Sequence, residues 1–142
     1  MNTKVNYLYR DASNYKTYNE AVLKGTLTEN QVQRIYNALD SGLYFIPHQV
    51  GLDEDRGRGS YYTDDDHCWF ELELRADDYG NVEYDELEGD FTLELTKAPP
   101  TVNMTAMEFV ERMEEAAAEG WDETSWMDGM EYATFDELAE SL

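Results

Sequence analysis

Two stretches that alternate strictly between apolar and polar residues constrain the fold more than any other feature of this sequence. Residues 67–75 read HCWFELELR and residues 91–96 read FTLELT, joined by the 15-residue connector 76–90. Successive side chains of a strand point to opposite faces, so the alternation predicts two strands of an antiparallel hairpin with one face buried. The side chains expected to face inward are Cys68, Phe70, Leu72, Leu74, Phe91, Leu93 and Leu95, and those expected to share the outward face are Glu71, Glu73 and Glu94.

Local signals in the first half of the chain predict further elements. Residues 4–10 alternate and predict a first strand, and residues 20–28 predict a second. Thr28 and Gln31 have the spacing of a capping box, which predicts a helix that begins there and stops near Gly42. Residues 53–66 are rich in Asp, Gly and Arg and predict a flexible surface loop.

Capping boxes also predict a helical C-terminal end. Thr105 with Glu108 predicts a helix that ends at Gly120, and Thr134 with Glu137 predicts a short helix over residues 135–142. The chain of 142 residues is 42% apolar, which is enough to bury a core. We therefore predict one α+β domain over residues 1–142: an antiparallel sheet of about four strands, one helix between the strand pairs and a helical C-terminal end.

The net charge of −22 is concentrated in one segment of the sequence. Residues 1–60 hold seven acidic and seven basic residues, whereas residues 61–142 hold 25 acidic and three basic residues. A net charge of about 2–8 keeps a small domain soluble, and a larger charge destabilises the compact state by self-repulsion. The contrast between the neutral residues 1–60 and the strongly acidic residues 61–142 therefore suggests that the excess has a function, although a solvated face remains the alternative.

The acidic residues around the predicted hairpin are the candidate binding surface. By the charge spacing of a DNA duplex, a surplus of 22 charges would match about 37 Å of duplex. Such an array would attract a protein surface that is built to hold nucleic acid, and it would repel nucleic acid itself. The residues predicted to bind a partner are Asp64, Asp65, Asp66, Glu71, Glu73, Asp77, Asp78, Glu83, Asp85, Glu86, Glu88, Asp90 and Glu94.

Two alternative functions remain open beside an acidic binding surface. The aromatic and basic residues near the N-terminus, Tyr7, Tyr9, Arg10, Tyr15, Lys16 and Tyr18, could hold a small nucleotide-like ligand. Asp66 and His67 could belong to the metal site of a hydrolase.

Cys68 on an inward strand position predicts an inert core thiol. The cluster predicted to belong to the core comprises Trp121, Trp126, Met127, Met130 and Tyr132.

Three stretches carry a resemblance to other proteins. YLYRDASNYK, YFIPHQVGL and DDDHCWFELE resemble segments of small uncharacterised proteins of bacteria and their mobile elements, a likeness that implies no activity. The strong acidity and the end TFDELAESL are similar in character to anti-restriction and anti-CRISPR proteins that imitate DNA. No residue-level motif supports this second likeness, so it implies a class of function and no functional residue.

Together these features predict a non-enzymatic acidic interaction protein, a DNA-mimic inhibitor of a nucleic-acid-binding protein such as a CRISPR effector or a restriction enzyme. The expected partner is a basic protein surface, with no direct nucleic acid, no membrane, no metal and no cofactor, and a homodimer stays compatible with the sequence. No apolar run approaches the roughly 20 residues of a membrane span, and the single Cys68 excludes an internal disulfide. A cytoplasmic location is therefore expected.

Overall fold

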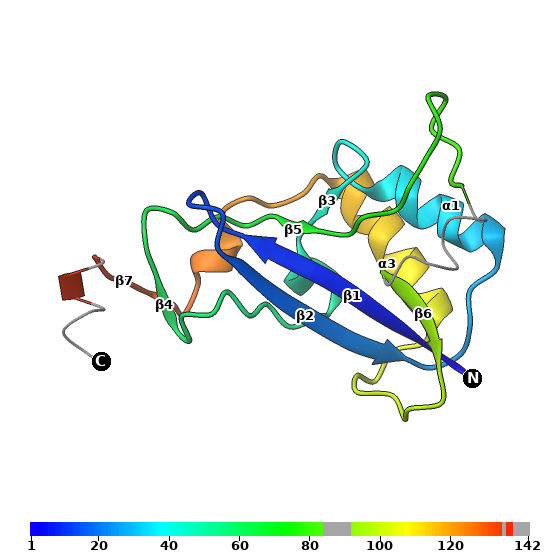
Figure 1. Ribbon diagram of the computed structural model, residues 1–142, viewed down its shortest axis with the longest axis horizontal. Helices are drawn as coiled ribbons and strands as arrows, with labels where there is room; N and C mark the ends of the chain where they lie inside the picture. The colour runs from blue at the N-terminus through cyan, green and yellow to red at the C-terminus, as the bar shows by residue number, and fades with distance from the viewer. Residues whose placement is uncertain (84–91, 135, 138–142) are drawn as a thin grey trace.

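The structure of the chain, a computed structural model, describes residues 1–83, 92–134 and 136–137 (Figure 1). It confirms the α+β class. The main sheet is antiparallel and has the strand order β2-β1-β5-β3, with β6 also paired with β1. Helices α1 and α3 contact each other and share one core with the sheet. The strands of this sheet are β1 (Asn2–Arg10), β2 (Lys16–Leu23), β3 (Tyr44–Phe45), β5 (Phe70–Glu71) and β6 (Leu93–Thr96).

Strand β1 is the centre of the sheet because both of its edges are paired, one with β2 and the other with β5 and β6. Val5, Tyr7 and Tyr9 are buried in the core that the sheet shares with the helices, and the residues between them face the opposite side. Strand β2 pairs with β1 over eight positions, from Thr3 opposite Leu23 to Arg10 opposite Lys16. The predicted second strand therefore begins earlier, at Lys16, and ends at Leu23 instead of residue 28. Its polar first half carries no hydrophobic signal because it lies at the sheet edge.

The predicted hairpin between residues 67–75 and 91–96 is wrong. Strand β6 pairs with β1, with Asn2 opposite Thr96, and β5 pairs with β1 through Leu8 and Glu71. The two segments thus lie end to end along the same edge of β1. In the first segment the alternation correctly predicts the buried side chains, because Cys68, Phe70, Leu72 and Leu74 are all buried. In β6, Leu93 packs against the core, but Leu95 is 66% exposed. Phe91 lies outside the described residues.

Both long helices begin where their capping boxes predict. In α1 (Glu29–Ala38) the Gln31 N–H donates to Thr28 Oγ1 at 3.2 Å, and the Gln31 side chain accepts from the Thr28 N–H at 2.8 Å. The helix ends at Ala38, before Gly42. Gly42 shapes the turn that follows, because it has φ +69° and a Cβ there would lie 2.8 Å from Tyr36 Oη.

Helix α3 (Ala106–Glu119) also has both capping hydrogen bonds, between Thr105 and Glu108, and ends at Gly120 as predicted. In the third capping box the Glu137 N–H donates to Thr134 Oγ1 at 3.1 Å. Asp136 and Glu137 are helical, and the rest of the predicted helix 135–142 lies outside the described residues. Across the described stretches of the chain, no helix is both long and apolar enough to cross a membrane.

A second, smaller core holds the C-terminal segment against the sheet. It is formed by Ile46, Cys68 and Trp126, with Trp121, Met127 and Met130 packed against it. The predicted C-terminal cluster is therefore core, except for Tyr132, which is half exposed. The flanking elements are two short 3-10 helices, η1 (Pro47–Val50) and η2 (Ser125–Met127), and a parallel pair of strands, β4 (Tyr61–Tyr62) and β7 (Glu131–Tyr132).

Candidate functional site

The three consecutive acidic residues before β5 have different surroundings. Asp64 is exposed, and its carboxylate raises the pKa of Tyr132 through a hydrogen bond. Asp65 accepts a hydrogen bond from the Ser13 hydroxyl. The side chain of Asp66 is fully buried, so among these three residues only Asp64 and Asp65 can contact a partner.

Asp66 belongs to a buried cluster, the Arg58 ion triad, formed by Asp11, Arg58 and Asp66. Arg58 Nη2 lies 2.8 Å from Asp11 Oδ2, and Arg58 Nη1 lies 2.8 Å from Asp66 Oδ1. Burial alone would raise the pKa of Asp11, but the hydrogen bond from Arg58 and the N–H groups of Tyr15 and Ser13 together lower it. The segment 53–66 is therefore not simply a surface loop. Charged residues are buried here because each charge has a partner of opposite sign.

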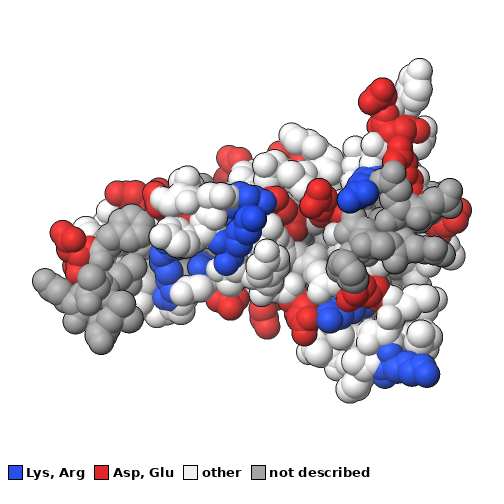
Figure 2. All heavy atoms as spheres, viewed as in Figure 1, with Lys and Arg blue, Asp and Glu red and all other residues white. Residues whose placement is uncertain are grey.

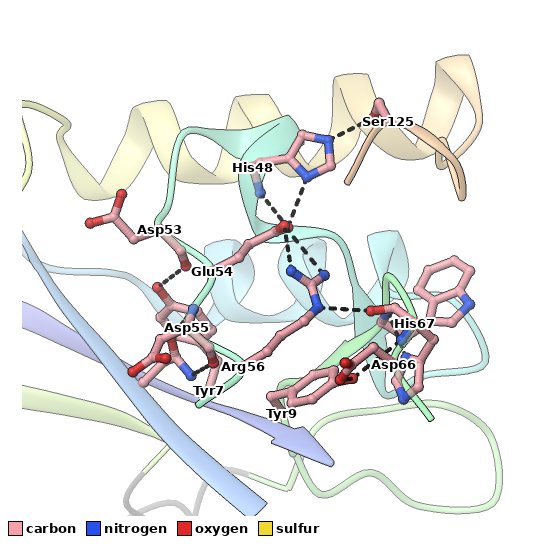
Figure 3. Close-up of polar contacts among 12 residues, drawn as sticks. Tyr7, Tyr9, His48, Asp53, Glu54, Asp55, Arg56, Asp66, His67 and Ser125 are labelled. Atoms are coloured by element: carbon pink, nitrogen blue, oxygen red, sulfur yellow. Dashed lines mark hydrogen bonds and ion pairs between the residues drawn. The ribbon is translucent and has the colours of Figure 1, made fainter. Parts of the chain in front are cut away.

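A second arginine of that segment, Arg56, is buried among aromatic rings. Its guanidinium carbon lies 4.6 Å from the centre of the Trp126 ring and 5.0 Å from that of Phe70. Arg56 Nε donates to the His67 carbonyl at 2.9 Å, and its two Nη atoms face Glu54 at 3.4 Å (Figure 3). Arg56 therefore joins the sheet to the small C-terminal core through cation–π contacts and charge-assisted hydrogen bonds.

Glu54 continues this network into an arrangement that resembles a catalytic triad. Ser125 Oγ lies 2.7 Å from His48 Nε2, and His48 Nδ1 lies 2.8 Å from Glu54 Oε2 (Figure 3). A serine nucleophile also needs donors for the oxyanion that forms. The N–H groups of Thr124 and Ser125 instead donate to the Asp122 carboxylate. The pKa of Asp122 is lowered to about 2, first by the Thr124 N–H, so this carboxylate is ionised beside Ser125.

An ionised carboxylate next to Ser125 would repel a developing oxyanion. The observed hydrogen bonds instead tie η2, which carries Ser125, to η1, which carries His48. We therefore interpret the Ser125, His48 and Glu54 chain as a structural connection between two short helices.

The alternative of a metal site at Asp66 and His67 also lacks ligands. His67 Nε2 donates to the Arg10 carbonyl at 2.7 Å, and Nδ1 accepts from the Trp69 N–H at 3.0 Å. The Asp66 carboxylate already accepts hydrogen bonds from Arg58, the Tyr9 hydroxyl and the Thr63 N–H. Within the described residues, no group of three or more His, Cys, Asp or Glu side chains is placed to hold a metal ion.

Glu71, Glu73 and Glu94 share one sheet face, as predicted, but they are not cross-strand neighbours. This open face is the side of the sheet opposite the helices and carries Lys4, Asn6, Leu8 and Arg10 of β1. Arg10 Nε lies 3.0 Å from Glu71 Oε2, and Lys4 Nζ lies 3.7 Å from Glu94 Oε2. Figure 2 shows Lys and Arg among Asp and Glu on the face it presents. Basic residues thus neutralise much of the acidity expected here.

The connector carboxylates are only partly described. Asp77 is exposed and caps the turn 77–81, where the N–H groups of Tyr79 and Asn81 donate to its Oδ1 atom and help to lower its pKa. Asp78 is exposed in the same turn, which projects from the body of the molecule (Figure 1), and Glu83 follows it half-buried. The remaining predicted residues, Asp85, Glu86, Glu88 and Asp90, lie outside the described residues.

Sequence reasoning missed a row of acidic residues on α3, the α3 carboxylate column, which comprises Glu111, Glu115 and Glu119. All three are exposed and none makes an ion pair with another described residue. Their spacing of four residues puts successive carboxylates about 6 Å apart on one side of the helix. Like charges at this spacing destabilise a helix by about 0.2–0.5 kcal/mol per pair. The recurrence of Glu every fourth residue was the available signal.

Comparison with known proteins identifies no relative: no family model, no curated protein and no solved structure matches this chain.

Proposed function

We propose that this protein is a non-enzymatic inhibitor whose acidic surface covers the nucleic-acid-binding surface of another protein, such as a CRISPR effector or a restriction enzyme. The observation that carries this proposal is the α3 carboxylate column, which is exposed and repulsive. At least six of the ten basic residues are used in ion pairs within the chain. The column forms no such ion pair with a described residue, although Glu114 and, to a lesser extent, Glu111 raise the pKa of Arg34, and Arg112 borders the same hollow as Glu115 and Glu119.

We propose that this column is the docking surface and that the exposed carboxylates Asp64, Asp77 and Asp78 add to the overall negative field. One strand of a duplex carries a charge every 3.4 Å along its axis, whereas the column carries one about every 6 Å. The column alone therefore has about half the charge density of one strand. The column therefore does not copy the phosphates of DNA one by one. It resembles DNA through its overall negative field, which predicts fast and salt-sensitive association with a partner.

The experiment is an affinity capture from bacterial lysate, with bound proteins eluted by a salt gradient and challenged with duplex DNA. A DNA-binding protein that is released by salt and displaced by duplex is the expected result. The absence of any such protein would count against the proposed function.

Two variants with equal net charge locate the docking surface. One replaces Glu111, Glu115 and Glu119 by Gln, and the other replaces Glu20, Glu73 and Glu94 of the open face by Gln. We expect the first variant to lose the captured protein and the second to retain it. If instead the second variant lost the captured protein and the first retained it, the proposed function would stand, but the docking surface would be the open face of the sheet.

A further inference from the structure

The open face of the sheet contains a pocket of about 380 Å³ that the acidic-surface proposal does not use. Three segments of the sheet form its floor, and residues beyond β5 and before β6 close one side. The residues that line it are Asn6, Tyr7, Leu8, Tyr18, Asn19, Glu20, Glu71, Glu73 and Thr92.

The strand register explains the composition of this pocket. Leu8 of β1 lies directly opposite Tyr18 on β2 and opposite Glu71 on β5, so an apolar residue separates an aromatic wall from an acidic one. Two residues along β1, on the same face, Asn6 lies opposite Glu20. Residues opposite each other in an antiparallel pair have Cβ atoms about 5 Å apart, so these groups reach the same small volume.

Tyr18 and Glu71 differ in their exposure. Tyr18 is 77% exposed, so its ring is open to a ligand in the pocket. The Glu71 side chain is only 17% exposed and already pairs with Arg10 at 3.0 Å, whereas Glu73 is exposed and has no ion pair with a described residue. A partly desolvated carboxylate attracts a cation more strongly than an exposed one does.

The charged residues around the pocket favour a positively charged ligand. Glu20, Glu71 and Glu73 line it, and Glu94 lies beside it, hydrogen-bonded to Asn6. The basic residues on this part of the face are Lys4, Arg10 and Lys16, which lies opposite Arg10. Four negative charges against three positive charges leave the site at about −1. A phosphate-bearing ligand, such as the nucleotide considered from the sequence, would therefore be repelled.

The volume of the pocket limits the size of a ligand. At about 30 Å³ per water-sized group, 380 Å³ holds about a dozen heavy atoms. Arginine and its close relatives have about this number. The pocket also falls within the range of about 300–1,000 Å³ of small-molecule sites.

We propose that this pocket binds an organic cation, a guanidinium or ammonium group on an apolar stem. The stem packs on Leu8 and the Tyr18 ring, and the cation lies between Glu71 and Glu73. Tyr18 adds a cation–π contact, which favours guanidinium over a simple metal cation. The cation can be a free small molecule or the arginine side chain of a protein, since both present the same group. The inference does not depend on the proposed function, because a small cation needs no docking partner.

The test is a titration of the ¹⁵N-labelled protein, followed by NMR at physiological ionic strength, with three probes. Butylguanidinium represents a free cation of the same charge, and N-acetyl-arginine amide represents an arginine side chain. N-acetyl-citrulline amide has nearly the same shape without the charge. We expect saturable shifts confined to the pocket for the two cationic probes, and binding at least about tenfold weaker for the citrulline compound. Tighter binding of butylguanidinium would identify a free ligand, and tighter binding of the arginine amide would identify a protein side chain.

Two single variants separate the pocket from the general negative field. Glu73→Gln removes an exposed carboxylate of the pocket and should weaken binding about fivefold. Glu119→Gln removes the same charge from α3 and should leave the affinity unchanged. Equal effects of the two variants, shifts spread over the acidic surface, or no saturable shift with either cation would overturn the inference. Because the probes act without a partner protein, these outcomes are separate from the success or failure of the lysate capture.

Discussion

The Arg58 ion triad yields a sharp prediction about stability, because one guanidinium holds two buried carboxylates. The side chains of Asp11 and Asp66 are 1% and 0% exposed, and that of Arg58 is 16% exposed. Arg58→Met preserves much of the apolar stem and removes the charge. The two carboxylates then remain buried without the cation that compensates them.

The expected cost follows from the geometry. Removing one partner from a buried ion pair destabilises a protein by about 3–5 kcal/mol. Asp11 keeps hydrogen bonds from the backbone of Ser13 and Tyr15, and Asp66 keeps those from Tyr9 and Thr63. We therefore expect a loss near the lower end, about 3 kcal/mol at pH 7. For a domain of this size, each kcal/mol lowers Tm by roughly 2–4 °C, which gives a total fall of about 6–12 °C.

The pH dependence tests the cause of this loss. In the native protein the pKa of Asp11 is lowered, because Arg58 and the backbone donors outweigh burial, so its stabilisation is present above the unfolded pKa and is lost as pH falls. Without Arg58, burial is opposed only by the N–H groups of Tyr15 and Ser13, so the pKa of Asp11 is higher in the variant than in the native protein. The folded variant then takes up protons as pH falls from 7 to 4. The difference in unfolding free energy between the two proteins should therefore shrink.

Urea unfolding monitored by tryptophan fluorescence at pH 7 and at pH 4.5 measures this difference. The control is Arg34→Met, which breaks the more exposed pair with Glu114 and should cost less than about 1 kcal/mol. A loss at Arg58 no larger than that at Arg34, or a difference that stays constant with pH, would refute the reasoning.

Two further predictions concern the small C-terminal core. Burial raises the pKa of Cys68 to about 11, so roughly one thiol in a thousand is ionised at pH 8, and maleimide should label Cys68 only after urea unfolds the protein. Rapid labelling of the folded protein would contradict this. Ser125→Ala should lower the unfolding free energy by about 1 kcal/mol through loss of the His48 hydrogen bond, and a fluorophosphonate should leave the wild-type protein unlabelled. A serine adduct on Ser125 would instead identify a nucleophile.

The sequence predicts the local features of this fold well. The capping boxes at Thr28 and Thr105 involve residues three positions apart, and each begins a helix where expected. The alternation in β1 correctly assigns Val5, Tyr7 and Tyr9 to the core. These signals suffice because cap geometry and side-chain alternation depend on neighbours in the chain.

Strand pairing and the buried polar network depend on distant residues, and the sequence could not predict them. Alternation shows which face of a strand is buried, but it does not name the partner strand, so β6 was paired with the wrong neighbour. His48 and Ser125 are 77 positions apart, and no local motif links them. Asp66 looked like one acidic residue in a run of three. Its burial depends on Arg58, which in isolation also resembles a surface residue.

The ion pairs show that the neutral residues 1–60 and the acidic residues 61–142 do not form separate neutral and acidic surfaces. Residues 1–60 look neutral on their own, but Lys4, Arg10, Arg34 and Arg58 each contact an acidic residue of the segment 61–142. The basic residues of the first segment therefore stabilise the second, and the carboxylates that remain exposed come from both. A fragment that contained only residues 61–142 would lose these cations together with β1, which pairs with β5 and β6. The acidic surface thus requires the whole fold, and a docking experiment must use the full chain.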